Sequence, residues 1–212
     1  MSESWLQLLE RHRAIAVIRA PEMELGYKMA VAVARGGMGL IEITWNSDRA
    51  KELINRLREE LPDCIVGTGT LLDKSSLKEA IAARAQFLFT PHVNLELIEA
   101  ARKAEVPIVP GTLSATEIVT AWQAGATCVK VFPISAVGGA AYLKSLQGPL
   151  GHIPLIPTGG VTMKNAREFI EAGAIAVGLA GDLFPKQLLN AGDWQAIARR
   201  SESLVRELGI SK

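Results

Sequence analysis

The feature that most constrains the fold is an alternation of short apolar runs with amphipathic stretches along all 212 residues. The apolar runs predict buried strands at residues 14–18, 40–44, 65–67, 87–90, 108–109, 128–132, 155–157 and 176–178. The amphipathic stretches predict helices at 24–35, 48–60, 74–83, 95–104, 115–124, 139–146, 164–172, 182–189 and 194–208. Strands that alternate with helices in this way predict a parallel sheet, because parallel neighbours need a crossover connection.

The number of strand–helix units predicts the fold class. Eight units are typical of an α/β protein of the (β/α)8 TIM barrel type. A further helical stretch at 3–12 precedes the first strand, so we expect an extra N-terminal helix. An open doubly wound sheet is the main alternative, but the count of eight and the lack of a Gly-x-Gly-x-x-Gly turn after the first strand disfavour it. No linker rich in Pro, Gly or Ser divides the chain, so we expect one domain over residues 1–212.

Charge and composition exclude several classes of partner. Lys and Arg number 23 and Asp and Glu number 22, and the two signs are mixed along the chain. This pattern offers no basic surface for a nucleic acid or a membrane. No apolar run approaches the roughly 18 residues of a membrane span, and the N-terminus does not resemble a signal peptide. Cys64 and Cys128 lie in apolar runs, so we expect reduced, buried thiols in a cytoplasmic protein.

Lys130 interrupts the apolar run at 128–132. A parallel strand that is covered by helices is normally apolar throughout. A buried ammonium is costly unless it is paired, neutral or in contact with water. Buried lysines shift their pKa readily, which is why they serve as bases and as Schiff-base formers. Lys130 is therefore the first candidate for a catalytic residue.

Strand geometry brings Glu42 into the same interior. Side chains alternate between the two faces of a strand, and both Lys130 and Glu42 have β-branched neighbours on the opposite face. Because the Val and Ile side chains suit the helix-covered face, both charged groups are expected inside the barrel. One hypothesis is a buried structural ion pair, which is weak evidence for stability. The other is a nucleophilic amine with a carboxylate as acid/base partner. Burial and a nearby Arg19 would lower the pKa of the amine, whereas an ionised Glu42 would raise it.

Glycine-rich turns follow the last two strands. Thr158, Gly159 and Gly160 come after residues 155–157, and Gly181 follows residues 176–178. In (β/α)8 enzymes the loops after strands seven and eight frequently bind phosphate, and glycines before a helix let backbone N–H groups approach an anion. Two ordinary glycine turns are the alternative. Asp182 is expected to be a helix N-cap rather than a ligand.

Two more strand ends carry polar groups that suit an anion. Thr70 ends the segment Gly67-Thr-Gly-Thr, whose hydroxyl and N–H groups could bind a carboxylate or a phosphate, although a plain turn explains it equally well. Arg19 ends the first strand and suits bidentate binding of a carboxylate, with an ion pair at the rim as the alternative.

The three histidines do not predict a metal site. His12 and His152 fall at a helix end and in a loop, and the chain has no His-x-x-x-His or Cys-x-x-Cys spacing. His92 follows a strand, where it would either line the pocket or lie on a surface loop. We expect no metal and no cofactor.

Six segments at the strand ends form a combined motif: Ala-Val-Ile-Arg-Ala at 16–20, Leu-Ile-Glu-Ile-Thr at 40–44, Val-Gly-Thr-Gly-Thr at 66–70, Phe-Thr-Pro at 89–91, Val-Lys-Val-Phe-Pro at 129–133 and Pro-Thr-Gly-Gly-Val at 157–161. Together they resemble the KDPG/4-hydroxy-2-oxoglutarate (KHG) aldolase family, where KDPG is 2-keto-3-deoxy-6-phosphogluconate. The resemblance runs over most of the chain with the segments in order. It implies a metal-independent class I aldolase on a (β/α)8 barrel, usually a homotrimer, that acts on pyruvate and a keto-deoxy sugar acid phosphate.

The resemblance also implies roles for individual residues. Lys130 would form the Schiff base, and Glu42 would act as general acid/base, partly through a bound water. The substrate-binding set would comprise Arg19 and Thr70 at the pyruvate carboxylate, Pro91 and Phe132 as pocket walls, Thr158 before the glycine pair, and the backbone of Gly159, Gly160 and Gly181 at the distal phosphate. The reaction would be reversible cleavage of KDPG into pyruvate and glyceraldehyde 3-phosphate, with 4-hydroxy-2-oxoglutarate cleaved to pyruvate and glyoxylate as a further activity.

The sequence departs from the family pattern at two positions. Many members carry an arginine four residues after the glutamate, where this chain has Asn46, and a serine in the loop after strand eight, where it has Gly181. Asparagine at the first position is typical of the phosphogalactonate aldolases, whereas Thr158 is typical of the gluconate type. A 2-dehydro-3-deoxy-6-phosphogalactonate aldolase is therefore one alternative. A phosphosugar isomerase or epimerase, or a silent phosphosugar-binding protein, are the others.

Overall fold

The computed structural model describes residues 4–210, and its strands are all parallel to their neighbours. The strands are β1 (Ala14–Ile18), β2 (Leu40–Thr44), β3 (Ile65–Gly69), β4 (Leu88–Phe89), β5 (Ile108–Val109), β6 (Gly111–Thr112), β7 (Val129–Val131), β8 (Leu155–Pro157) and β9 (Val177–Leu179). One sheet has the order β5-β4-β3-β2-β1-β9, and the other has the order β6-β7-β8. A parallel bridge between Thr158 and Gly178 connects β8 to β9.

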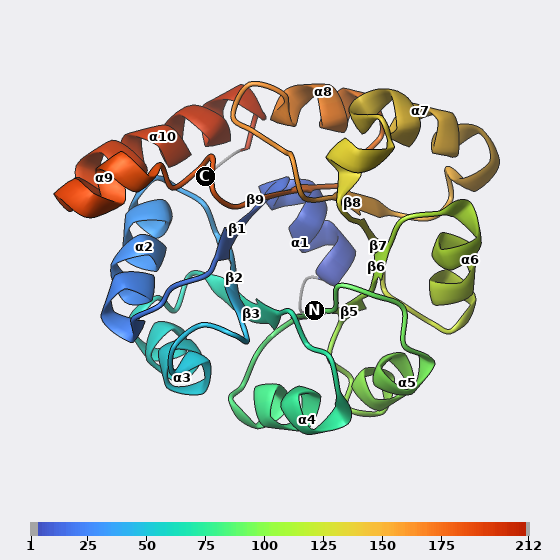
Figure 1. Ribbon diagram of the computed structural model, residues 1–212, viewed down its shortest axis with the longest axis horizontal. Coiled ribbons are helices and arrows are strands. Elements are labelled where there is room, and N and C mark those ends of the chain that lie inside the picture. The colour runs from blue at the N-terminus through green and yellow to red at the C-terminus, as the bar shows by residue number, and fades with distance from the viewer. Residues whose placement is uncertain (1–3, 211–212) are drawn as a thin grey trace.

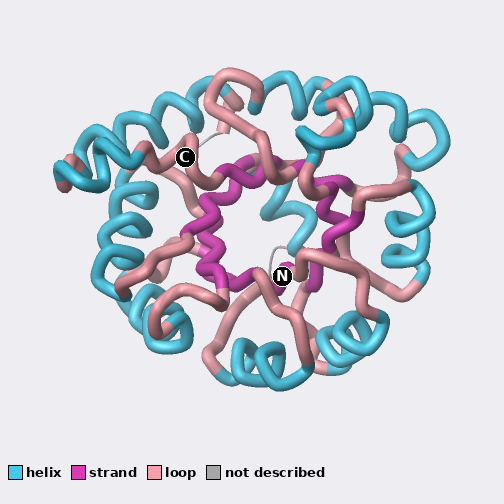
Figure 2. Tube along the Cα trace, viewed as in Figure 1, coloured by secondary structure: helices cyan, strands magenta, loops and turns pink. Residues whose placement is uncertain are grey.

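Helices surround the strands on the outside (Figure 1). They are α1 (Trp5–His12), α2 (Met23–Arg35), α3 (Ala50–Glu60), α4 (Lys74–Ala82), α5 (Leu95–Lys103), α6 (Ala115–Gln123), α7 (Gly139–Leu150), α8 (Ala166–Glu171), α9 (Lys186–Ala191) and α10 (Trp194–Glu207). Figure 2 shows the strands curled into a ring, with only α1 drawn inside that ring. The protein therefore has an α/β fold with a curled parallel sheet and an outer layer of helices.

The structure confirms the predicted order of strands and helices and corrects three details. The strand predicted at 108–109 continues after Pro110 as the short strand β6. A 3-10 helix at Ile134–Val137 follows β7 and was not predicted. The helix predicted at 182–189 is wrong at its start, because α9 begins at Lys186 and the preceding residues form turns. Proline at 185 accounts for this boundary, since a proline removes a backbone donor and suits a helix start. The first residue of the helix predicted at 3–12, Glu3, lies outside the described residues.

Two separate groups of buried side chains confirm the predicted alternation of faces. Ile41 and Ile43 of β2, like Val129 and Val131 of β7, belong to the large core between strands and helices. Leu40 belongs instead to a smaller core that the strands enclose. The pattern fits a sheet with one face toward the helices and one toward its own interior.

Helix α1 covers the interior at the amino ends of the strands. Its N-terminus is closed by a capping box, in which Ser4 and Gln7 exchange hydrogen bonds between side chain and backbone. The ring of Trp5 stacks on Phe87 with centroids 4.8 Å apart, and its Nε1 donates to the Cys128 sulfur at 3.4 Å. Both cysteines are buried free thiols, as predicted. The interior is thus sealed at this end, which leaves the carboxyl ends of the strands for a site.

None of the helices within residues 4–210 is long and apolar enough to span a lipid bilayer. This finding agrees with the short apolar runs of the sequence.

Trp5→Ala should lower the free energy of unfolding by about 3–5 kcal/mol, because it removes a large buried ring from the enclosed core. Urea-induced unfolding, followed by circular dichroism, measures the change. Trp194→Ala is the matched control, since Trp194 is only half-buried at the start of α10 and should cost clearly less. Equal losses for the two variants would contradict the role given to α1.

Candidate active site

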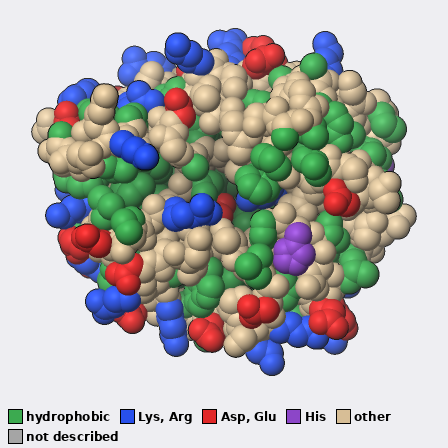
Figure 3. Space-filling view, in the orientation of Figure 1, with side chains coloured by type: hydrophobic (Ala, Val, Ile, Leu, Met, Phe, Trp, Pro, Cys, Tyr) green, Lys and Arg blue, Asp and Glu red, His purple; other side chains and the backbone are tan. Residues whose placement is uncertain are grey.

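A cavity of about 530 Å³ opens at the carboxyl ends of the strands. Of the residues that the sequence singled out, it is lined by Arg19, Glu42, Thr70, Pro91, Lys130, Phe132, Thr158, Gly159 and Gly181. Gly160 is not among the lining residues, although it directly follows one of them. In Figure 3 basic and acidic side chains are visible near the centre of the face shown, among hydrophobic ones. Residues from distant parts of the chain therefore meet where a barrel would place its chemistry.

Lys130 lies in the middle of β7 and is nearly enclosed, with 7% of its surface exposed. Its Nζ is 4.7 Å from the ring centroid of Phe132 and 5.7 Å from that of Phe89, so aromatic faces replace part of its lost hydration. Burial is the largest influence on the pKa of Lys130 and lowers it below the ordinary 10.5. Glu42 opposes this shift and Arg19 adds to it. The net result favours the neutral amine that a nucleophile requires.

Glu42 lies in β2 with 2% of its surface exposed. Burial raises its pKa above the ordinary 4.5, and the positive charges of Lys130 and Arg19 pull it back in part. Among residues 4–210, Glu42 and Lys130 influence each other through space without a direct ion pair. A structural ion pair would require direct contact, so the geometry favours two reactive groups that face a shared space.

Gly69 at the end of β3 makes room for the glutamate. A Cβ atom at this position would overlap Oε1 of Glu42, and the next nearest atoms are also those of the same carboxyl group and its stem. A larger residue would displace the carboxyl group, so glycine lets Glu42 keep its position through a close approach and not through its backbone angles. In the sequence this glycine is recognisable only as part of a turn.

Thr70, the next residue, adopts a positive φ of 63°. This left-handed conformation is unfavourable for a β-branched residue. Backbone strain of this kind is concentrated at functional sites, where the surrounding structure holds the residue in place. Thr70 lines the cavity in this conformation, which agrees with a binding role for the turn.

The glycine pair after β8 adopts conformations that suit glycine. Gly159 has φ +78° and Gly160 has φ +96°, and a Cβ on Gly160 would overlap the side chain of Ser135. The pair therefore packs directly against the segment that follows β7. The helix predicted to begin at 164 begins at Ala166, so these glycines precede a short turn and not a helix N-terminus.

Asp182 connects the loops after β8 and β9 and is not the helix N-cap that the sequence predicts. Its Oδ2 accepts the backbone N–H of Met163 at 2.8 Å. Arg200 of α10 donates to the Asp182 carbonyl at 2.6 Å and lies 3.6 Å from Oδ2. The missed helix boundary at Pro185 explains the error, because the aspartate lies four residues before α9 starts.

Sequence reasoning missed several residues that line the cavity. They are the apolar residues Val17, Met29, Ala180, Phe184 and Leu189 and the basic Lys186, whereas Thr44 was expected at this end of its strand and also lines the cavity. Lys186 begins α9. The signal that could have revealed it was Pro185, because a proline is typical of the start of a helix. It would have placed Lys186 in the first turn of the helix. His92 does not line the cavity, and its carbonyl accepts the Thr90 hydroxyl at 2.6 Å.

Within residues 4–210 no cluster of three or more His, Cys, Asp or Glu side chains is placed to hold a metal ion. The only acidic side chain that lines the cavity is Glu42, among the residues described.

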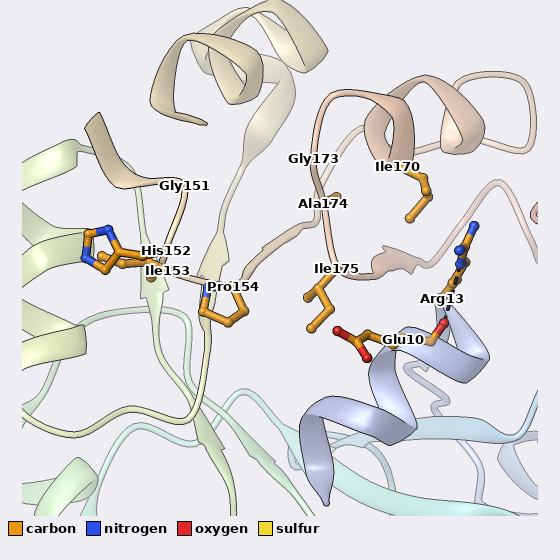
Figure 4. A pocket seen from close by; sticks show the side chains of 10 residues that line it. All are labelled: Glu10, Arg13, Gly151, His152, Ile153, Pro154, Ile170, Gly173, Ala174 and Ile175. Atoms are coloured by element: carbon orange, nitrogen blue, oxygen red, sulfur yellow. Dashed lines mark hydrogen bonds between the residues drawn. The ribbon is translucent and has the colours of Figure 1, made fainter. Parts of the chain in front are cut away.

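A second cavity of about 390 Å³ lies near the amino ends of β8 and β9 (Figure 4). Figure 4 shows Arg13 beside Glu10 of α1, with Pro154 and Ile175 across from them. The Arg13 guanidinium donates to the carbonyls of Glu10 and Leu208, at 3.4 and 3.3 Å. These bonds tie α1 to the end of α10, so this cavity is explained by stability and not by chemistry.

The sequence matches the model of the aldolase family described as KDPG and KHG aldolase over residues 6–200. The chain belongs to this family. It is 37% identical to a 2-dehydro-3-deoxy-phosphogluconate aldolase of Pseudomonas aeruginosa over 84% of this chain and 81% of that protein. It is 32% identical to the enzyme of the same name from Dickeya dadantii, over 94% of this chain and 93% of that protein.

A solved structure of a family member is similar over nearly the whole chain. It is a KDPG aldolase from Legionella pneumophila with pyruvate captured at low pH as a covalent carbinolamine intermediate. The TM-score is 0.87 at 28% identity, and the match covers 94% of this chain and 97% of that one. The aldolase family and the geometry of the cavity thus agree.

Gly69→Ala should reduce aldolase kcat/KM by about 100-fold or more, because the added methyl group displaces the carboxylate of Glu42. Steady-state kinetics measure the loss, and circular dichroism checks the fold. Gly148→Ala is the matched control, since a Cβ there meets nothing within 4 Å. Full activity of Gly69→Ala would show that Glu42 does not need its present position.

Glu42→Gln should lower the pKa of Lys130, because the removed carboxylate raises it in the wild type. Lys130 is acylated at a series of pH values with a small amine-reactive reagent, and the extent of labelling is measured by peptide mass spectrometry. The pH at half-maximal labelling gives the midpoint of the titration. The wild-type midpoint should lie below 10.5, and that of the variant lower still. The exposed Glu99→Gln change should leave the midpoint in place, and an upward shift in Glu42→Gln would overturn the electrostatic account.

Proposed function

We propose that this protein is a class I aldolase that reversibly cleaves KDPG into pyruvate and glyceraldehyde 3-phosphate. The observation that carries the proposal is the enclosed Lys130, whose pKa is lowered by burial, in one cavity with Glu42. The family relationship supports the same reaction. Cleavage of 4-hydroxy-2-oxoglutarate to pyruvate and glyoxylate is a second activity of the same site.

The proposed reaction begins with the neutral amine of Lys130. Its lone pair attacks the C2 ketone, and the resulting carbinolamine loses water to give a protonated imine. The imine withdraws electrons, so the C3–C4 bond breaks as the C4 hydroxyl loses its proton. The aldehyde product leaves, and the enamine that remains on Lys130 takes a proton at C3. Water then adds to C2 and releases pyruvate with the free amine. The captured pyruvate carbinolamine of the Legionella pneumophila relative supports this sequence of steps.

Glu42 is proposed to move the protons in these steps. Its pKa is raised by burial, so the carboxyl group holds a proton more readily than an exposed glutamate does and can also release it. Because it is not in direct ion-pair contact with Lys130, a water molecule between the two groups can carry the proton. The same separation lets the amine stay neutral, since direct contact with an ionised carboxylate would favour the ammonium.

The remaining predicted residues are proposed to hold the two ends of the substrate. Arg19 and Thr70 would bind the carboxylate, and Pro91 and Phe132 would form walls beside the reacting carbons. Arg19 is close enough to Lys130 and Glu42 to lower the pKa of both, which supports a place near C1. The backbone N–H groups of the loops with Gly159, Gly160 and Gly181 would bind the phosphate.

The stereochemical preference follows from two positions. Thr158 lines the cavity and is 6% exposed. Because threonine at this position is typical of the gluconate-type aldolases, it favours the gluconate substrate. Asn46 is exposed and does not line the cavity, so its galactonate-type identity carries less weight. An isomerase or epimerase activity is disfavoured, because such a reaction would not use Lys130 as a nucleophile.

We further propose that the fold is a closed (β/α)8 barrel with an extra N-terminal helix, as one domain over residues 1–212. The bridge between Thr158 and Gly178 supports closure, and β5 with β6 supports a single interrupted strand. A cytoplasmic homotrimer is also proposed. Four exposed large apolar side chains after neighbouring strands support an interface between copies, and they are Leu72, Leu95, Leu113 and Phe132.

Borohydride reduction in the presence of pyruvate should add a stable mass to a peptide that contains Lys130, because reduction traps the imine. In a coupled assay the wild type should release pyruvate from KDPG, and Lys130→Ala should abolish both signals. Thermal unfolding of Lys130→Ala should show a fold close to the wild type. An adduct on another lysine, or none, would refute the Schiff-base role, and global unfolding of the variant would favour the structural ion pair.

A further inference from the structure

We propose that Lys186 binds the distal phosphate of the substrate and thereby makes the enzyme prefer phosphorylated over unphosphorylated keto acids. The proposal rests on the proposed aldolase function and deepens it. The predicted phosphate site comprises only backbone groups, whereas the structure adds the cationic side chain of Lys186 to the lining of the cavity.

Lys186 enters the cavity from the segment that follows β9. It lines the cavity together with Gly181 of the same segment and with Gly159 of the loop after β8. The loops are neighbours because β8 and β9 are linked by the bridge between Thr158 and Gly178. An anion that is bound by the backbone of these two loops would therefore lie on the side of the cavity formed by β8 and β9, where the segment with Lys186 begins.

The charge of Lys186 is available to a ligand. Its side chain is exposed, and within residues 4–210 it makes no ion pair or hydrogen bond. The two other cations that line the cavity, Arg19 and Lys130, act on Glu42. Unlike Arg19, Lys186 is not among the charges that shift the pKa of Glu42 or Lys130. A substrate fixed at C2 on Lys130 carries its phosphate at C6, at the far end of the molecule, where a cation that is not engaged with Glu42 can bind it.

The nearest acidic residue of the same loop does not neutralise this charge. The Asp182 carboxylate accepts the N–H of Met163 and faces the guanidinium of Arg200. These contacts tie the carboxylate to the α8 and α10 side of the loop. The aspartate thus fixes the two anion-binding loops relative to each other, and it leaves the cavity side to the lysine.

The local sequence explains why a charged side chain matters here. Ala180 and Gly181 line the cavity after β9 and offer no hydroxyl group. Among the described residues after β9 that line the cavity, Lys186 is the one with a polar side chain, so it can add a charged donor to the backbone N–H groups at a doubly charged phosphate. A hydrogen bond to a charged partner is worth more than a neutral one, and lysine acts on phosphate as a point charge.

The test compares kcat/KM for KDPG with that for 4-hydroxy-2-oxoglutarate, which has no phosphate. Lys186→Met should lower the ratio of the two values by about 10- to 100-fold, mainly through the KM for KDPG. Lys186→Arg should restore most of the ratio, because it keeps the charge. Lys144→Met, an exposed lysine on α7 away from this cavity, is the matched control and should keep the wild-type ratio.

Inorganic phosphate provides a second measurement. It should inhibit 4-hydroxy-2-oxoglutarate cleavage by the wild type competitively, and its inhibition constant should rise at least several-fold in Lys186→Met. An unchanged substrate ratio and an unchanged inhibition constant would overturn the role of Lys186. That outcome differs from failure of the proposed function, in which the wild type itself would neither cleave KDPG nor form an adduct at Lys130.

Discussion

The burial of the Lys130 amine beside a carboxylate is the constraint on which the rest of the site depends. Removing an ammonium from water is unfavourable, and the protein meets this cost by lowering the pKa of the lysine and by placing aromatic rings near Nζ. Glu42 is kept within electrostatic range but out of direct contact. The same arrangement that makes the lysine a poor structural residue favours its neutral form, which a nucleophile requires.

Maintaining this arrangement requires precise support from small and strained residues. Gly69 lacks the Cβ that would overlap Glu42, and Thr70 holds a left-handed backbone conformation next to it. At the opposite end of the strands, Trp5 closes the interior by stacking on Phe87. Packing therefore closes one end of the strands and the candidate site lies at the other, which is the division of roles found in barrels of parallel strands.

The sequence predicted the elements well where periodicity was long and regular, and less well where short turns decided the geometry. The strand at 40–44 agrees with β2, and the inward position of Glu42 follows from the two-residue repeat. The predicted helix at 182–189 is wrong at its start, because α9 begins only after Pro185. The predicted N-cap role of Asp182 is wrong for the same reason, and its carboxylate accepts the N–H of Met163 instead. Lys186 was not predicted as a site residue for the same reason, because a helix that starts at 182 places the lysine in its interior and not at its start.

By itself, the sequence determined the order of strands and helices, the inward position of Lys130 and Glu42, and the loops that carry glycine at the rim. These features depend on local periodicity and on residue type, which one chain reveals. Only the tertiary structure decided that Glu42 needs Gly69, that Asp182 joins two loops to α10, and that Lys186 shares the cavity with Gly159 and Gly181. Those relations join residues far apart in the chain, and they exist only after the strands have curled and packed.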